Sequence, residues 1–140
     1  MSAFFIDYFI FVFLLALGAI QITASLNGLS GILFFHKPLL SKIFGLAIII
    51  FAIGWFYFSG DRNLNDVYGG LDANDQSGLF ALGVIAALFI TVVISSVTNR
   101  NRLNIDTIFS ETEGLGNLTT NTYYVALSKN LRYWVKRWNL

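Results

Sequence analysis

Oxygen-bearing side chains gather between the second and third apolar stretches of the sequence, where they could hold a cation. Segment 61–72 places them at positions one, three, five and twelve, as a calcium-binding loop does: Asp61, Asn63, Asn65 and Asp72. The sixth position carries Asp66 where such loops have Gly, and the twelfth lacks the usual bidentate Glu. Asn, Asp and Gly also favour turns. We therefore expect a solvated connecting loop, with calcium binding as the alternative.

His36 is the single histidine of the chain and lies beside Lys37, at the end of the first apolar stretch. Its imidazole could hydrogen-bond a quinone, or ligate one face of a haem shared with another subunit. The alternative is an interfacial histidine that is simply solvated. One His and no Cys exclude multi-His metal sites, thiolate sites and disulfides within this chain. We therefore expect no cofactor held by this chain alone.

The sequence carries no recognisable catalytic motif. No Ser stands in a nucleophile elbow, and no second His is present to complete a triad. Gly114-Leu115-Gly116 is too short for a dinucleotide-binding motif. A net charge of +1 provides no basic field for nucleic acid. We predict a non-enzymatic protein without a nucleic-acid partner.

The composition of the chain indicates that a lipid bilayer, rather than water, surrounds much of it. Hydrophobic residues make up 56% of the 140 residues and charged residues only 12%, whereas soluble domains carry about a quarter charged residues. Three long stretches contain no charge and can each cross a hydrocarbon core of about 30 Å. The predicted fold class is an all-α integral membrane protein with three transmembrane helices, an extended tail and a C-terminal amphipathic helix.

The expected transmembrane domain comprises residues 1–99, with helices at about 4–35, 38–59 and 78–99 and an outer loop at 60–77. The first helix would be too long for a bilayer, so it must tilt, project or break. Segment 27–31, with two Gly and a Ser, is the natural place to bend; close packing of a straight helix is the alternative. Lys37-Pro38 marks the turn into the second helix.

Basic residues predict the topology. The first loop holds Lys37 and Lys42, and Arg100 and Arg102 follow the third helix, whereas the acidic loop holds only Arg62. Because basic residues concentrate on the cytoplasmic side, the N-terminus and the acidic loop are expected outside and the tail inside.

Small and polar residues recur every fourth position on the third helix. The stripe consists of Gly83, Ala87, Thr91 and Ser95, followed by Asn99. This spacing lets helices approach closely. The stripe could pack within the chain or against another subunit, and both readings remain open.

A polar cluster on the first helix comprises Gln21, Thr23, Ser25 and Asn27. Polar groups in hydrocarbon need partners, so we expect interhelical hydrogen bonds, with the lining of a substrate path as the alternative. No charged residue lies deep in any helix, which argues against a pump or ion-coupled transporter formed by this chain alone.

The tail, residues 100–140, is expected to be cytoplasmic. It reads as an extended linker to about residue 121, then as a helix over about 122–138. Apolar residues on one side of this helix would dock to a membrane or a partner: Tyr124, Leu127, Leu131, Trp134 and Trp138. Lys and Arg fall mostly on the other side, which suits an anionic leaflet, and a groove in a partner protein is the alternative.

These patterns together favour a structural function. We expect a non-catalytic accessory subunit of a larger membrane complex, bioenergetic or transport, in a bacterial or archaeal cytoplasmic membrane. Its partners would be other membrane subunits and the lipid bilayer. A homo-oligomeric channel or transporter is the first alternative, because three helices can enclose little without further copies. An anchor that contributes His36 to a quinone or haem site is the second.

Overall fold

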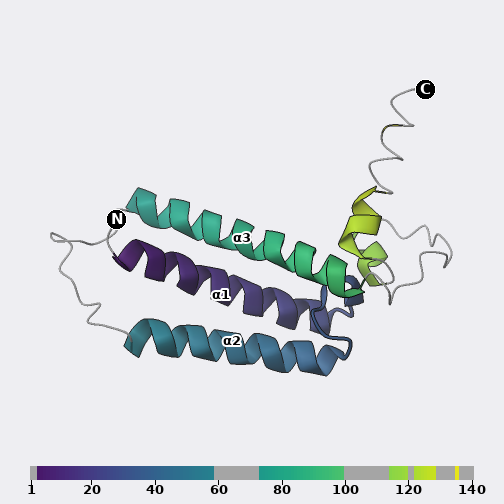
Figure 1. Ribbon diagram of the computed structural model, residues 1–140, viewed down its shortest axis with the longest axis horizontal. Helices are drawn as coiled ribbons and strands as arrows, with labels where there is room; N and C mark the ends of the chain where they lie inside the picture. Colours follow the sequence, from purple (N-terminus) through teal and green to yellow (C-terminus); the bar gives the residue numbers. More distant parts are fainter. Residues whose placement is uncertain (1–2, 59–72, 100–113, 120–121, 129–134, 136–140) are drawn as a thin grey trace.

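The computed structural model describes residues 3–58, 73–99, 114–119, 122–128 and 135. They form α1 (Ala3–Leu26), a 3₁₀ helix η1 (Ser30–Ile32), α2 (Pro38–Phe58), α3 (Ala73–Asn99) and a second 3₁₀ helix η2 (Gly114–Thr119). Residues 123–128 are also helical, and this part of the chain contains no strand. The prediction of an all-helical protein is confirmed (Figure 1).

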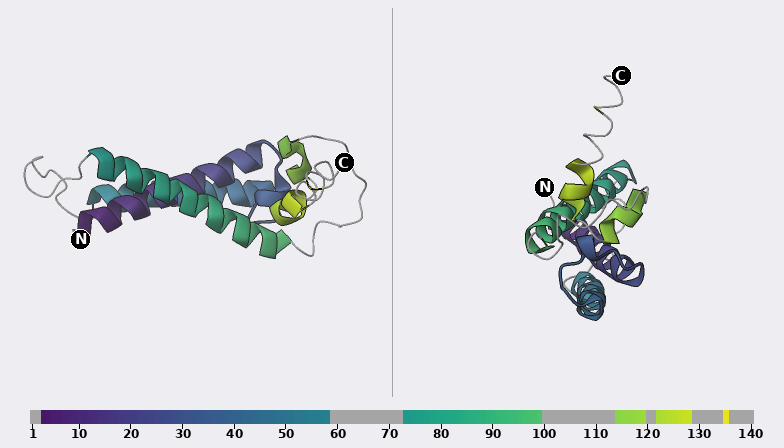
Figure 2. Two further views of the ribbon diagram at one scale, coloured as in Figure 1. Left: turned by 90° about the horizontal axis from the view of Figure 1, so that it is seen from above. Right: turned by 90° about the vertical axis from the view of Figure 1, so that its right-hand side faces the viewer.

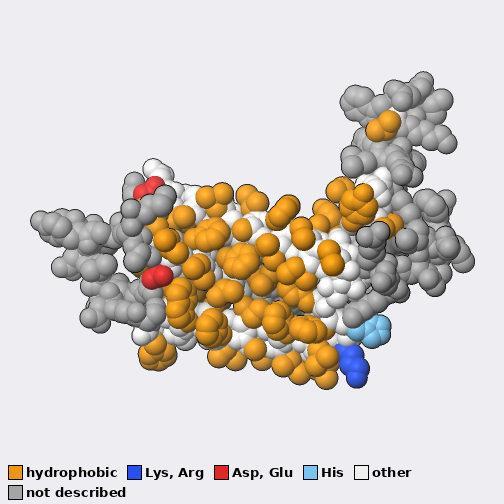
Figure 3. Space-filling model, in the orientation of Figure 1, with side chains coloured by type: hydrophobic (Ala, Val, Ile, Leu, Met, Phe, Trp, Pro, Cys, Tyr) orange, Lys and Arg blue, Asp and Glu red, His pale blue; other side chains and the backbone are white. Residues whose placement is uncertain are grey.

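Three of these helices are long and apolar enough to cross a membrane, as the sequence predicts. The spans contain 23, 21 and 27 residues, and at about 1.5 Å per residue each exceeds the roughly 30 Å hydrocarbon core. Figure 3 shows a broad apolar surface between acidic side chains at one end and basic ones at the other. By length and composition this is a multi-pass membrane protein.

The helices lie side by side with α1 in the middle (Figures 1 and 2). α1 packs against α2 on one side and α3 on the other, while α2 and α3 share hardly any contact. α2 runs antiparallel to α1, and α3 runs parallel to it. The N-terminus, the end of α2 and the start of α3 therefore share one end of the molecule.

Two glycines bring α1 and α2 into backbone contact. A Cβ atom added to Gly18 would lie 2.6 Å from the carbonyl oxygen of Gly45, and the reverse distance is also 2.6 Å. Further along the same interface, Ala52 of α2 is fully buried, and the rings of Phe11 and Phe56 stack with centroids 4.2 Å apart. Small residues thus set the helix separation, and aromatic rings fill the space beyond them.

The first helix is shorter than the expected 4–35, because the chain breaks at Gly28. Gly28 has a φ of 66°, a left-handed conformation that costs glycine little. The Leu29 N–H donates to the carbonyl oxygen of Ala24 at 2.9 Å, which is the bond of a Schellman helix end. The first apolar stretch was expected to tilt, project, break or pack as a straight helix, and the structure shows that it breaks. α3 is longer than expected, since it begins at Ala73 rather than near residue 78.

Candidate functional site

The connection between α1 and α2 folds over the ends of the three helices, and buried side chains bind its backbone. Gln21 of α1 has no exposed surface. Its Nε2 donates to the carbonyl oxygen of Ile32 at 3.3 Å, and its Oε1 accepts the Phe34 N–H at 3.0 Å. One amide therefore satisfies an acceptor at the end of η1 and a donor just beyond it.

The other two long helices each add one such side chain. Ser41 of α2 is fully buried, and its Oγ accepts the Phe35 N–H at 3.2 Å. Asn99, the last residue of α3, donates through Nδ2 to the carbonyl oxygens of Leu33 at 2.9 Å and Ser30 at 3.4 Å. Irregular backbone is tolerated at membrane depth only where the protein itself satisfies it. The three side chains thus tie the connecting loop to all three helices.

The polar cluster predicted on the first helix lies at this loop end. Gln21 binds the loop, and the Ser25 hydroxyl donates to the carbonyl oxygen of Pro38, the first residue of α2, at 2.7 Å. Asn27 donates to the carbonyl oxygen of Thr23 within its own turn, and Thr23 itself is exposed. The bonds of Gln21 and Ser25 therefore hold the loop and the start of α2 in place, whereas that of Asn27 stays within the end of α1.

The stripe on α3 makes up the buried residues of that helix: Gly83, Ala87, Thr91, Ser95 and Asn99. A Cβ atom on Gly83 would lie 2.9 Å from Cγ1 of Val12, so α1 is the neighbour at that position. The Thr91 and Ser95 hydroxyls donate back to carbonyl oxygens of α3, at 2.7 and 3.3 Å. The contact rests on close packing, and its hydroxyls form no bond across to α1.

Described parts of the tail lie against the same loop. Leu118 is 3% exposed, and the Ser30 hydroxyl donates to the carbonyl oxygen of Thr119, so η2 sits on η1. Thr122 caps the helix at 123–128, with its Oγ1 accepting the Val125 N–H. A short helix at 114–119 therefore stands where the sequence suggests only a linker.

Two of the five predicted docking residues are described, and both are exposed. Tyr124 is 69% exposed and Leu127 is 46% exposed. Leu131, Trp134 and Trp138 lie outside the described residues. So do the four calcium candidates: Asp61, Asn63, Asn65 and Asp72. The described residues contain no group of three His, Asp or Glu side chains that could hold a metal ion.

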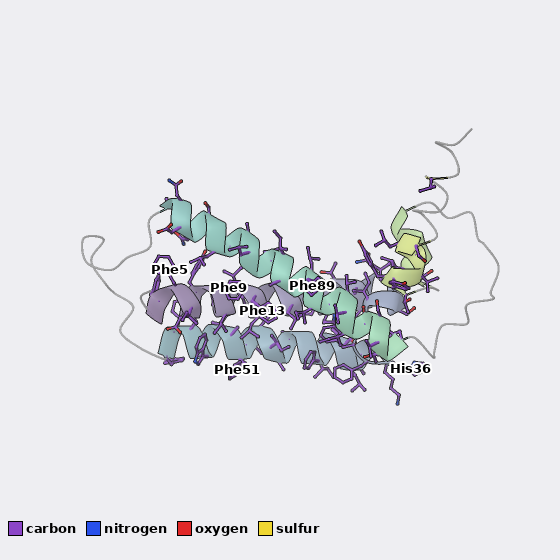
Figure 4. The ribbon with its side chains drawn as sticks, turned by 45° about the horizontal axis from the view of Figure 1, so that its top comes forward. Phe5, Phe9, Phe13, His36, Phe51 and Phe89 are labelled. Atoms are coloured by element: carbon purple, nitrogen blue, oxygen red, sulfur yellow. The ribbon has the colours of Figure 1, made fainter. Side chains whose placement is uncertain are left out.

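His36 is exposed at the loop end of the molecule, next to the exposed Lys37 (Figure 4). It makes no hydrogen bond within the described part of the chain, and no described aromatic ring stacks on it. His36 is thus exposed and accessible, and its role at a quinone or haem site stays a prediction.

Sequence reasoning missed Gly18, Gly45 and Ser41. The available signal was the spacing of small residues on the second helix, where Ser41, Gly45 and Ala52 share one face. No protein-family model, curated protein or solved structure matches this chain.

Proposed function

We propose that this chain is a non-catalytic accessory subunit that packs against a larger membrane complex, of bioenergetic or transport type. The observation that carries the proposal is the open arrangement of the helices. In no span is more than 28% of its apolar 18-residue segment buried within the described structure, and α2 and α3 flank α1 on separate sides. Helices arranged in this way offer most of their surface to neighbours.

The bonding of five buried polar side chains also supports a structural role over a channel. Gln21, Ser41 and Asn99 bind the connecting loop, and Thr91 and Ser95 bond within α3. A pore lining needs polar groups that face water or an ion. These groups are instead occupied in holding the helices and the loop together, which suits a rigid packing element.

We further propose that the N-terminus lies outside and the tail in the cytoplasm. Support comes from the parallel course of α1 and α3, which puts Lys37 and Asn99, the residue before Arg100, at one end. The cytoplasmic side is the one that collects basic residues. In this orientation η2 and the helix at 123–128 lie on the cytoplasmic surface, available to a partner or the leaflet.

The subunit role is tested by purifying the chain from its own membranes in a mild detergent and identifying accompanying polypeptides by mass spectrometry. We expect stoichiometric recovery of at least one different membrane protein. Recovery of the chain as a monomer, or only with its own copies, would contradict the proposal.

The orientation is tested with single cysteines, since the native chain has none. Ser77→Cys and Lys37→Cys place a thiol at opposite ends, and both positions are exposed. A membrane-impermeant maleimide added to intact cells should label Cys at 77 and spare Cys at 37 until the membrane is broken. The reverse pattern would overturn the proposed orientation.

A further inference from the structure

The outward side of α2 carries a continuous stripe of large, exposed side chains. Its members recur at alternating intervals of four and three residues: Leu39, Ile43, Leu46, Ile50, Ile53 and Tyr57. This spacing places them on one side of the helix. The small residues of α2 that permit close helix contact, such as Gly45, face α1 instead. Protein–protein contacts in membranes favour small residues, so this stripe is better suited to acyl chains.

The stripe has the length and the ends of a lipid-facing surface. From Leu39 to Tyr57 it rises about 27 Å, at about 1.5 Å per residue, which is close to the thickness of the hydrocarbon core. Tyr57, 67% exposed, stands at one end, where its phenol suits an interface. Lys42 is exposed at the other end, where a long side chain can extend its ammonium group to the headgroups.

Positive charge is concentrated at that second end. Lys37, which follows His36 in the sequence, and Lys42 are both exposed there. Within the described residues neither lysine forms an ion pair. The described carboxylates, Asp7 and Asp75, lie at the opposite end of the helices (Figure 3). The two ammonium groups therefore have no described carboxylate to neutralise them.

We propose that Lys37, Lys42 and the α2 stripe form a binding surface for an anionic phospholipid. The lysines hold the phosphate of the headgroup, and the acyl chains lie along Leu39, Ile43 and Leu46. Charge complementarity selects the headgroup, and the apolar stripe selects a lipid over a soluble phosphate. The inference requires only that the helices span a bilayer, so it stands or falls separately from the accessory-subunit role.

The test is native mass spectrometry of the whole chain released from micelles that contain equimolar phosphatidylglycerol and phosphatidylcholine. Wild type should retain phosphatidylglycerol preferentially. Lys37→Gln with Lys42→Gln should reduce this preference by roughly fivefold for each lysine. Lys37→Arg with Lys42→Arg should preserve it, because the charges remain. Arg62→Gln is the matched control, since it removes a positive charge from the connection between the other ends of α2 and α3.

Several outcomes would overturn the proposal. The tail's basic residues are identical in all these proteins, so an unchanged preference in the double Gln variant would exclude Lys37 and Lys42 as the cause. An equal loss in the double Arg variant would show that charge is not what matters. Competition by millimolar inorganic phosphate would identify a soluble anion rather than a lipid. Circular dichroism of each variant verifies that the helices are retained.

Discussion

Gly18 and Gly45 meet backbone to backbone, and the position that a Cβ atom would occupy on each glycine lies against the carbonyl oxygen of the other. The contact lies about two thirds of the way along α1 and one third of the way along α2, and it fixes the separation of the two helices. Such an approach maximises van der Waals contact, which is the main attraction between helices in lipid. The loop beyond it can then be reached by side chains from both helices.

Gly18→Ala should destabilise the protein by about 1–3 kcal/mol, because the new methyl group would overlap a backbone oxygen that cannot move alone. Gly54→Ala on the neighbouring helix adds the same methyl group in open space. It should be neutral or stabilise by up to about 1 kcal/mol through helix propensity. The measurement is unfolding by sodium dodecyl sulfate titration, and equal midpoints for the two variants would refute the contact.

Gln21→Leu and Ser41→Ala should have separate effects on neighbouring amides. Gln21 accepts the Phe34 N–H and Ser41 accepts the Phe35 N–H. Each substitution should accelerate exchange of its own amide about fivefold to tenfold, the equivalent of one net hydrogen bond. Hydrogen exchange followed by NMR in micelles resolves the two positions. If either variant accelerated both amides alike, the side chains would not bind the loop individually.

Phe11 and Phe56 should show a coupling energy of about 0.5–1.5 kcal/mol in a double-mutant cycle to Leu, because their rings stack across the α1–α2 interface. Phe11 and Phe44 provide the control cycle, since Phe44 packs on Phe34 and Phe35. That cycle should give a value near zero. The stacking account fails if both pairs couple equally in denaturation experiments.

Leu118→Ser should release the 3₁₀ helix of the tail from the loop. The side chain is 3% exposed, and a buried hydroxyl without a partner is costly. Amides of residues 114–119 should then exchange faster while those of α3 remain protected. Tyr124→Ser, at a position 69% exposed, is the control and should leave them unchanged. Unaltered exchange in Leu118→Ser would show that Leu118 does not secure the tail.

The three spans follow from the sequence because they depend on a local property, the absence of charge over about 20 residues. The sequence locates a possible helix break near Gly28 but does not show that the helix breaks there, since glycine permits a left-handed turn without requiring one. The Gly18–Gly45 pairing could not be predicted, because each helix offers more than one face with small residues.

The role of Gln21 was harder still to foresee. An amide side chain in hydrocarbon requires hydrogen-bond partners, but the sequence does not identify those partners. Its partners here are backbone groups of Ile32 and Phe34, and they come within reach only after the chain has turned at Gly28. The site at the helix ends is therefore a consequence of tertiary structure.

The most direct test of the accessory-subunit account is photo-crosslinking in native membranes. A photoreactive phenylalanine analogue is placed at Phe89 of α3 or at Phe51 of α2, which are 66% and 62% exposed (Figure 4). We predict that at least one position yields an adduct of the 15.6 kDa chain with a different membrane polypeptide. Adducts at both positions with lipid alone, or only with other copies of this chain, would contradict the account.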